Sequence, residues 1–356
     1  MHPETIARPD PVTRGHSPPH AASPAYGCAE AECGMPAAGA GFLVCRRCAR
    51  SLRPIDGIMV DSALPPAADA IPVDAEALRQ VSAVSSARLG DHWWSMLRQE
   101  FGERSDLDLL EVGAGPGVLT LGLATRGRAR RLVVSDASRS LLAANRLLLL
   151  EAGVEPGPHL TWLAGSIGDL PLRSESLDAV LGNSVLRQVR DYTAVLAVLA
   201  RLLRPGGVLI LGEPVLQGRA FIGLLARLLH DLDIRTAAPL FSADEHRLLF
   251  DLATMSRSEF WRGEGASGPT GDQHLFDVEE IRRLAPALGY ADLEVRPWKL
   301  IEDGFLAEFR EALRGMGIND APLAAYTFLF EAVQDQLVAQ LGAAVPTAFA
   351  HLVFRR

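Results

Sequence analysis

The sequence predicts an α/β protein with a parallel, doubly wound sheet that is covered by helices on both faces. Short, uniformly apolar segments alternate with helical patterns from about residue 107 onward, and such strands are typical of parallel sheets buried on both sides. The first of these segments runs directly into a glycine-rich turn, Gly113 to Gly117. In such sheets a ligand binds at the carboxyl ends of the strands. We therefore expect a Rossmann-like sheet with additions at both ends of the chain.

Composition and charge restrict the possible functions. The chain has 356 residues, 48% of them hydrophobic and 22% charged, which is enough for a buried core and excludes wholesale disorder. No apolar run approaches the ~18 residues of a membrane helix. Residues 1–26 contain several prolines and no apolar stretch, so we expect a flexible tail and no export signal. We therefore expect a cytoplasmic protein. The net charge of -8 argues against a nucleic-acid partner held by its phosphates.

The four cysteines of the chain lie close together, in the spacing C-x4-C-x11-C-x2-C: Cys28, Cys33, Cys45 and Cys48. Two close pairs of thiols can converge on one tetrahedral zinc ion, and a four-thiolate site is closed and structural. The alternatives are four unrelated thiols or two disulfides, and a cytosolic location disfavours disulfides. The spacing therefore predicts a zinc-ribbon module over residues 27–62.

The rest of the chain divides into two further regions. Residues 63–104 combine a linker rich in proline and alanine with a helical pattern from Ala75 to Phe101. We expect residues 105–356 to form one larger domain. The apolar runs of its first half predict strands at 107–112, 131–135, 160–163, 177–181 and 208–211, with helices at 118–124, 141–152 and 192–203.

The glycine turn differs from a dinucleotide-binding turn. Its spacing is GxGxG, with Val118 where a third glycine would stand in GxGxxG. Glu111 precedes the first glycine by two residues, and a carboxylate there suits a cationic ligand better than a pyrophosphate. Asp136, at the end of the next strand, can accept hydrogen bonds from both hydroxyls of a ribose.

In order and spacing, these motifs resemble those of class I S-adenosylmethionine-dependent methyltransferases, in the branch of the quinone-biosynthesis and small-molecule enzymes. The matching segments are Glu111–Gly117, Leu132–Asp136, Ala164–Leu172, Leu177–Asn183 and Leu203–Gly207. The resemblance implies S-adenosylmethionine as the cofactor. It implies a cofactor site made of Glu111, Gly113, Gly115, Gly117, Asp136, Ala137, Ser166, Ile167 and Asn183.

The chain departs from the family pattern at two places. Ser166 stands where the family has an aspartate for the adenine amino group, and Asp169 is a candidate substitute for that carboxylate. Arg187 and Gln188 stand where the family often has two histidines, which weakens the assignment of a general base there. In the N-terminal module, the segment from Leu43 to Asp61 resembles the zinc ribbon and following strand of many bacterial methyltransferases.

Two long insertions predict a helical cap over the acceptor pocket, at 216–275 and 303–342. They carry His230, His246 and His274, each of which has a packing or surface role as its alternative. His274 follows a glycine-rich loop that could act as a lid hinge, and we take it as the candidate catalytic residue. A closed apolar pocket would suit an aromatic or hydrophobic small molecule.

Three functions remain open at this point. The first is a small-molecule methyltransferase with a structural zinc, acting as a monomer or homodimer. The second is a zinc-containing rRNA or tRNA methyltransferase, which the acidity disfavours. The third is a non-catalytic regulatory protein that binds S-adenosylmethionine, which the intact glycines disfavour.

Overall fold

The computed structural model describes residues 37–38, 42–44, 50–64, 83–126, 129–157, 159–255, 274–298, 304–319, 321–341 and 347–356. All four cysteines lie outside these residues, as do the N-terminal tail, most of the linker and the glycine-rich loop at 263–271. The predicted zinc ribbon, the start of the helix predicted from Ala75 and the lid hinge are therefore not described.

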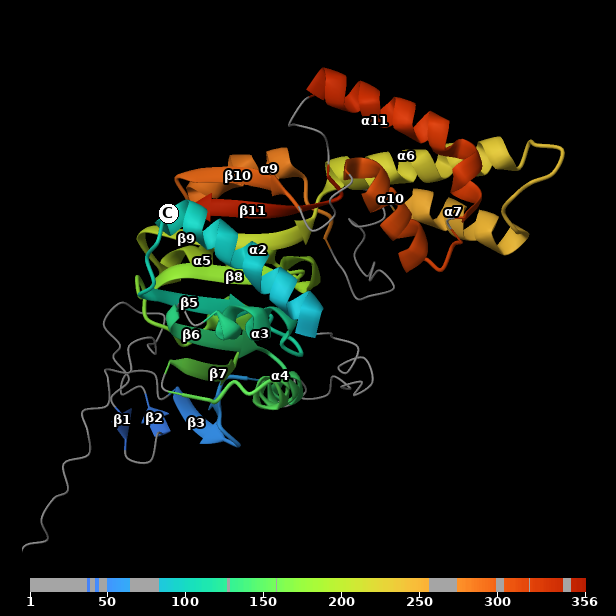
Figure 1. Ribbon diagram of the computed structural model, residues 1–356. Coiled ribbons are helices and arrows are strands. Elements are labelled where there is room, and N and C mark those ends of the chain that lie inside the picture. Colours follow the sequence, from blue (N-terminus) through green and yellow to red (C-terminus); the bar gives the residue numbers. More distant parts are fainter. Residues whose placement is uncertain are drawn as a thin grey trace, which may run out of the picture.

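The described residues build one eleven-stranded sheet in the order β1-β2-β3-β4-β7-β6-β5-β8-β9-β11-β10 (Figure 1). Its parallel centre consists of β7 (Leu160–Ala164), β6 (Ala129–Asp136), β5 (Leu107–Val112), β8 (Leu177–Asn183) and β9 (Leu203–Pro214). The antiparallel strands β11 (Phe349–Arg355) and β10 (Asp292–Pro297) follow at one edge. This arrangement confirms the predicted sheet of a Rossmann-like α/β fold.

β9 begins earlier than the sequence predicts. The sequence predicts this strand over 208–211, but it already starts at Leu203. Its pairing with β8 shifts between Leu203 and Val208, and Gly206 has a φ of 77°. The Pro-Gly-Gly sequence therefore forms an irregularity within the strand, because the glycine can adopt the left-handed region.

Helices cover both faces of the sheet, each over an apolar cluster. One face carries α2 (Ala83–Phe101), α3 (Val118–Thr125) and α4 (Arg139–Glu151), packed around Trp93, Leu109 and Leu142. The other carries α5 (Tyr192–Leu202) and α9 (Val278–Leu284), packed around Leu199 and Ile281. Side-chain caps start three of these helices, since Ser138, Asp191 and Asp277 accept hydrogen bonds from the first-turn N–H groups of α4, α5 and α9.

The N-terminal module adds a hairpin to the other edge of the sheet. β3 (Ser51–Ile55) and β4 (Ile58–Asp61) pair antiparallel, and β4 runs parallel to β7. The sequence predicts a single strand here, whereas Asp56 and Gly57 reverse the chain with φ values of 52° and 80°. An Asp-Gly pair with both residues left-handed forms a hairpin turn. Two short strands, β1 (Ala37–Ala38) and β2 (Phe42–Val44), continue the sheet beyond β3.

The two insertions form one helical layer. It consists of α6 (Leu216–Asp233), α7 (Ala243–Met255), α10 (Gly304–Gly315) and α11 (Thr327–Leu341), which share a third apolar cluster around Leu229, Phe309 and Phe330. Figure 1 shows this layer beside the end of β9, from which α6 leads away. Glu308 of α10 ties the layer to the sheet, because its Oε2 accepts a hydrogen bond of 2.7 Å from the N–H of Ala348.

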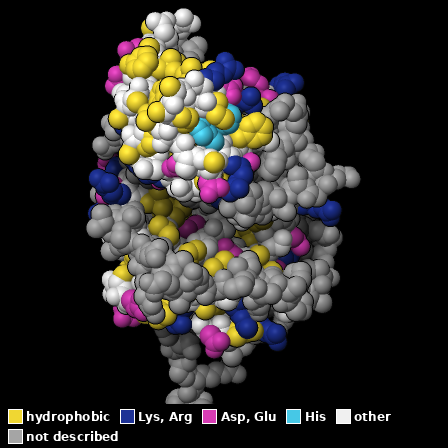
Figure 2. Space-filling view, turned by 90° about the vertical axis from the view of Figure 1, so that its right-hand side faces the viewer, with side chains coloured by type: hydrophobic (Ala, Val, Ile, Leu, Met, Phe, Trp, Pro, Cys, Tyr) yellow, Lys and Arg dark blue, Asp and Glu magenta, His cyan; other side chains and the backbone are white. Residues whose placement is uncertain are grey.

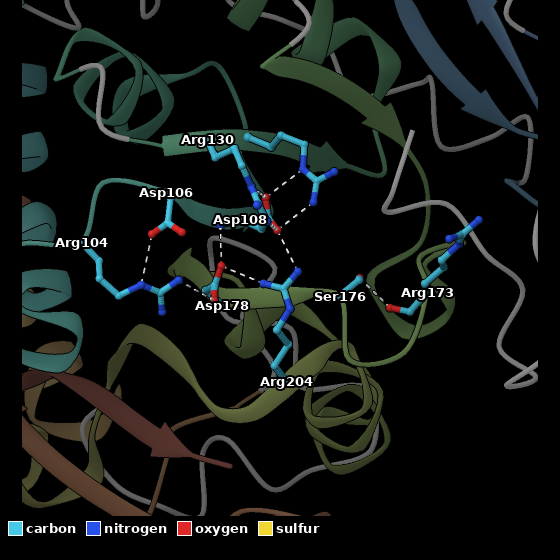
Figure 3. Close-up of polar contacts among 9 residues, drawn as sticks. Arg104, Asp106, Asp108, Arg130, Arg173, Ser176, Asp178 and Arg204 are labelled. Carbon is cyan, nitrogen blue, oxygen red and sulfur yellow. Dashed lines mark hydrogen bonds and ion pairs between the residues drawn. The ribbon is translucent and has the colours of Figure 1, made fainter. Parts of the chain in front are cut away.

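An ion cluster closes the amino-terminal edge of the sheet, on the side opposite the glycine turn (Figure 3). Asp108 is 1% exposed and contacts Arg130, Arg131 and Arg204, while Asp178 contacts Arg204. Burial by itself would raise the pKa of Asp108, but the hydrogen bonds from the three arginines outweigh it and hold the pKa well below its ordinary value. This cluster is structural.

Candidate functional site

The glycine turn lies at the carboxyl end of β5, where it leads into α3. Gly113, Gly115 and Gly117 all have positive φ, at 61°, 52° and 106°. A Cβ at Gly113 would lie 2.4 Å from Cγ2 of Val185, and a Cβ at Gly117 would lie 2.9 Å from Cγ of Asn145. Both the backbone conformation and the space therefore require glycine at these positions.

Glu111 lies under this turn as a buried carboxyl group. It is 2% exposed, and burial raises its pKa to about 8 against hydrogen bonds from Thr120 that lower it, with the charge of Asp136 raising it further. Its Oε2 has no hydrogen-bond partner among the described residues. A buried carboxylate with one unpaired oxygen suits a cationic group such as the ammonium of an amino acid, because a cation offsets the cost of burying the charge.

Asp136 ends β6 beside the same turn. Its Oδ2 accepts a hydrogen bond of 2.9 Å from the N–H of Gly115, and its Oδ1 accepts one of 2.8 Å from the N–H of Ser138. Burial raises its pKa in spite of these bonds. The carboxylate is half-buried and next to Ala137, at the position where the sequence predicts recognition of a ribose.

A third part of the site follows β7, in the short turn η2 (Ile167–Asp169). Ser166 is exposed and Ile167 is half-buried. Asp169 has a different partner from the one that the sequence suggests: its Oδ1 accepts a hydrogen bond of 2.9 Å from Arg50. Because Arg50 also binds the buried Asp61, it fixes this turn to the N-terminal hairpin. Asp169 thus binds Arg50 through Oδ1, and its role as a substitute for the adenine-binding carboxylate stays a prediction.

The segment that follows β8 forms another wall of the site, on the other side of the glycine turn from η2. Glu213 at the end of β9 is fully buried, and its Oε1 accepts hydrogen bonds of 2.9 Å and 2.7 Å from the N–H groups of Val185 and Leu186. Burial raises its pKa to about 7, against these bonds. Glu213 therefore holds the 185–187 backbone against the glycine turn. Asn183, at the end of β8, is half-buried, and its Oδ1 has no partner among the described residues.

Of the three candidate histidines, His274 lies next to this wall. Its Nε2 is 2.7 Å from the carbonyl oxygen of Val189, and its backbone N–H donates to the carbonyl of Arg187. His230 and His246 lie in the helical layer instead, with their rings 5.1 Å apart and paired with Asp231 and Asp233. The structure therefore brings His274, and not the other two, to the edge of the sheet that carries the glycine turn.

Figure 2 shows the molecule from the side of this edge. The helical layer stands above a hollow in which hydrophobic and acidic side chains are visible. Among the described residues, no three His, Cys, Asp or Glu side chains come together as a metal site. Within the same part of the chain, no helix combines the length and the apolar character needed to cross a membrane.

The comparisons with known proteins agree with this geometry. Residues 110–211 match the family described as methyltransferase domain, and they contain the glycine turn, Asp136 and the end of β8. The class that fold, site and match define is that of the S-adenosylmethionine-dependent methyltransferases, and the protein is an enzyme of that class.

Individual relatives are distant. The demethylmenaquinone methyltransferase of Tropheryma whipplei is 27% identical over 241 residues, which are 68% of this chain and 88% of that protein. The ubiquinone biosynthesis O-methyltransferase of Xanthomonas axonopodis pv. citri is 34% identical over 128 residues, 34% of this chain and 51% of that protein. The structure of phosphoethanolamine N-methyltransferase 2 from Haemonchus contortus with S-adenosylmethionine aligns with a TM-score of 0.44 and 15% identity, over 75% of this chain and 52% of that one.

Proposed function

We propose that this protein transfers the methyl group of S-adenosylmethionine to a small aromatic or hydrophobic acceptor, of the quinone or secondary-metabolite type. The observation that carries the proposal is the helical layer that follows β9 at the carboxyl edge of the sheet. It stands over the hollow at the carboxyl edge, where an acceptor would meet the cofactor. Relatives named as demethylmenaquinone methyltransferase and ubiquinone biosynthesis O-methyltransferase support the same acceptor class.

The residues of the site fit the cofactor. The unpaired Oε2 of Glu111 suits its ammonium group, Gly115 borders open space, and Asp136 can bind its ribose. When bound, S-adenosylmethionine supplies an electrophilic methyl group on a sulfonium. The displacement of that group needs little beyond alignment of the two reactants and exclusion of water, which the walls of the site would provide.

An oxygen or carbon acceptor also has to lose a proton, and His274 is our candidate to accept it. The carbonyl oxygen of Val189 can only accept a hydrogen bond, so Nε2 of His274 carries the hydrogen. In the neutral imidazole the lone pair is then on Nδ1, which is the nitrogen available as a base. Glu213 is a poorer candidate, because it is fully buried and its oxygens accept backbone N–H groups.

The test is methyl transfer from labelled S-adenosylmethionine to reduced quinones, phenols and metabolite extracts, with structured RNA as a parallel substrate. We expect label in an apolar small molecule. The variant His274→Gln keeps a donor for Val189 and removes the base, so we expect turnover to fall by about 100-fold, the lower end for loss of a general base, with unchanged cofactor affinity. Unchanged turnover in this variant would exclude His274 as the base.

The two alternative functions predict different results. Label in RNA, together with tight RNA binding at physiological salt, would support the rRNA or tRNA methyltransferase. Cofactor binding with no transfer to any acceptor would support the regulatory protein. The net charge of -8 disfavours the first alternative, and the steric requirement for glycine at positions 113 and 117 is common to all three functions.

We also propose that Cys28, Cys33, Cys45 and Cys48 hold one structural zinc ion, on the basis of their spacing. Elemental analysis should find about one zinc per chain, lost in Cys45→Ser and Cys48→Ser, because a closed site needs all four thiolates. A metal-free protein with normal stability would contradict this proposal. It would leave the methyltransferase assignment untouched.

A further inference from the structure

The turn η2 is connected to the N-terminal hairpin by a largely buried arginine, Arg50, which directly precedes β3. Its side chain is 11% exposed. Nε and Nη2 donate to the two carboxylate oxygens of Asp61, at the end of β4, and the bond from Nε is 2.9 Å long. Nη1 donates to Oδ1 of Asp169 over 2.9 Å, and Nη2 also donates to the backbone carbonyl of Asp169. One guanidinium group therefore binds two carboxylates from distant segments of the chain.

This contact lies on the side of η2 that faces away from Asp136. In the sheet order β4-β7-β6, η2 follows β7, while Asp61 ends β4 and Asp136 ends β6. The N–H of Gly165, just before the turn, donates to the backbone carbonyl of Asp136 over 3.0 Å. A nucleoside whose ribose binds the carboxylate of Asp136 would therefore place its base beside η2, where the sequence predicts the adenine.

Arg50 leaves one carboxylate oxygen of Asp169 available. The side chain of Asp169 is 57% exposed, and within the described part of the chain its Oδ2 has no hydrogen-bond or ion-pair partner. A carboxylate oxygen can only accept, so it suits the exocyclic amino group of adenine and opposes the carbonyl group that hypoxanthine carries instead. Because Arg50 binds both Oδ1 and the backbone carbonyl of this residue, the arginine determines the direction of Oδ2.

The hairpin has other contacts that hold it on the main sheet. β4 pairs with β7 over three residues, 58–60 against 162–164. On α4, Nη1 of Arg146 donates to the backbone carbonyl of Asp56, in the hairpin turn, over 3.2 Å. Docking of the hairpin therefore does not depend on the bonds from Arg50 to Asp169, and these bonds act on η2.

We propose that Arg50 is a positioning residue of the cofactor site, which orients Asp169 so that Oδ2 accepts a hydrogen bond from the amino group of the adenine. The N-terminal hairpin is then a working part of the cofactor site. The proposal rests on the proposed function, because it presumes S-adenosylmethionine as the ligand. It assigns part of the adenine selectivity to a residue outside 110–211, the segment that matches the methyltransferase family.

The test compares two ligands by calorimetry on the full-length protein. S-Adenosylhomocysteine carries adenine, and S-inosylhomocysteine carries hypoxanthine, in which a carbonyl group replaces the amino group. The wild type should bind the adenine ligand at least about tenfold more tightly, as for a hydrogen bond to a charged group. In Asp169→Asn, Arg50 still binds the amide oxygen, so the NH₂ group faces the base. We expect the preference to invert in favour of S-inosylhomocysteine.

Replacing Arg50 separates positioning from support of the fold. In Arg50→Lys the charge beside Asp61 remains, but the donors lie on one nitrogen and cannot hold both carboxylates as the planar guanidinium group does. We expect the adenine preference to fall below about threefold, the range of a neutral substitution. In the double variant Arg50→Lys/Asp169→Asn the amide is released, so the inversion should disappear. Arg146→Lys is the matched control, because it changes a hairpin contact that does not touch η2, and it should keep the wild-type preference.

Equal losses for both ligands in Arg50→Lys, with the ratio of the two affinities unchanged, would show that Arg50 only supports the fold, and would overturn the proposal. An inversion in the double variant as large as in Asp169→Asn would overturn it as well. If Arg50→Lys does not fold, Asp169→Asn still decides, since an unchanged adenine preference would contradict the role of Oδ2. A wild-type protein that binds neither ligand would instead overturn the cofactor assignment, which distinguishes the failure of the proposed function from the failure of this inference.

Discussion

Replacing Glu111 by glutamine should stabilise the ligand-free protein in mildly alkaline solution while it weakens cofactor binding. The glutamine side chain has the shape of the protonated acid and can still accept the hydrogen bond from Thr120. Burial raises the pKa of Glu111 from 4.5 to about 8 in the folded protein. The folded wild type therefore holds a proton between these values that the unfolded chain has lost, and its free energy of unfolding decreases as the pH rises through this window.

The magnitude follows from the pKa difference. Each pH unit within the window costs the wild type about 1.4 kcal/mol, so the whole shift corresponds to about 5 kcal/mol. Between pH 6 and pH 8 the stability of Glu111→Gln relative to the wild type should thus rise by about 2–3 kcal/mol. Glu213 titrates in the same range, with a pKa raised to about 7, but it is present in both proteins and cancels in the difference.

The assay is urea unfolding of both proteins at pH 6, 7 and 8, with Glu151→Gln as the control for an exposed carboxylate on α4. The groups near Glu111 are Asp136 from β6, Thr120 from α3, Asn145 from α4 and the paired residue Leu181 of β8. Asp136 is the charged neighbour that could share the titration. A stability difference that does not change with pH would refute the reasoning, since it would mean that Glu111 titrates normally in the folded protein.

Three further substitutions test the glycine turn, the ion cluster around Asp108 and the contact between Arg50 and Asp61. Gly113→Ala should abolish cofactor binding measured by calorimetry, because its Cβ would meet Val185 at 2.4 Å on a backbone with φ 61°; binding as in the wild type would contradict the described turn. Asp108→Asn should lower the free energy of unfolding by about 3 kcal/mol, since a buried carboxylate shared by three arginines is lost, and an unchanged urea midpoint would contradict this. Arg50→Gln should leave Asp61 buried without its ion pair and speed hydrogen exchange along β4, an effect that Arg53→Gln, at an exposed position on β3, should not produce.

The parts of the fold that the sequence predicts are those with a local signal. The strands from β5 to β9 each contain a short apolar run, and the glycine turn, Asp136 and Asn183 stand at the carboxyl ends of β5, β6 and β8. The pair Asp56-Gly57 is a local sequence signal for the turn between β3 and β4. The apolar residues on both sides of this pair nevertheless led to the prediction of a single strand. That the hairpin joins the main sheet depends on pairing with β7, about a hundred residues away, which no local pattern reveals.

The buried hydrogen bond between Asn145 and Thr120 could not be predicted in the same way. Thr120 and Asn145 are separated by 25 residues, and each lies in a helix whose pattern otherwise predicts only packing. Arg50 and Asp169 are 119 residues apart in the sequence. The sequence therefore suggests Asp169 as an adenine ligand but does not predict its ion pair with Arg50. Partners of this kind are set by how elements pack, not by the residues next to them.

The two buried carboxyl groups at this edge differ in a way that separates a ligand site from a structural one. Glu213 and Glu111 have nearly the same exposure, and burial raises the pKa of both. Glu213 has N–H donors from three consecutive residues, so its bonding is complete within the protein and it holds a loop. Glu111, within the described part of the chain, has an Oε2 atom without a hydrogen-bond partner. A buried carboxylate with an unpaired oxygen costs free energy in the unliganded protein, and a bound cation would offset that cost. We therefore expect the unpaired Oε2 of Glu111, and not Glu213, to be the atom that a cationic ligand group completes.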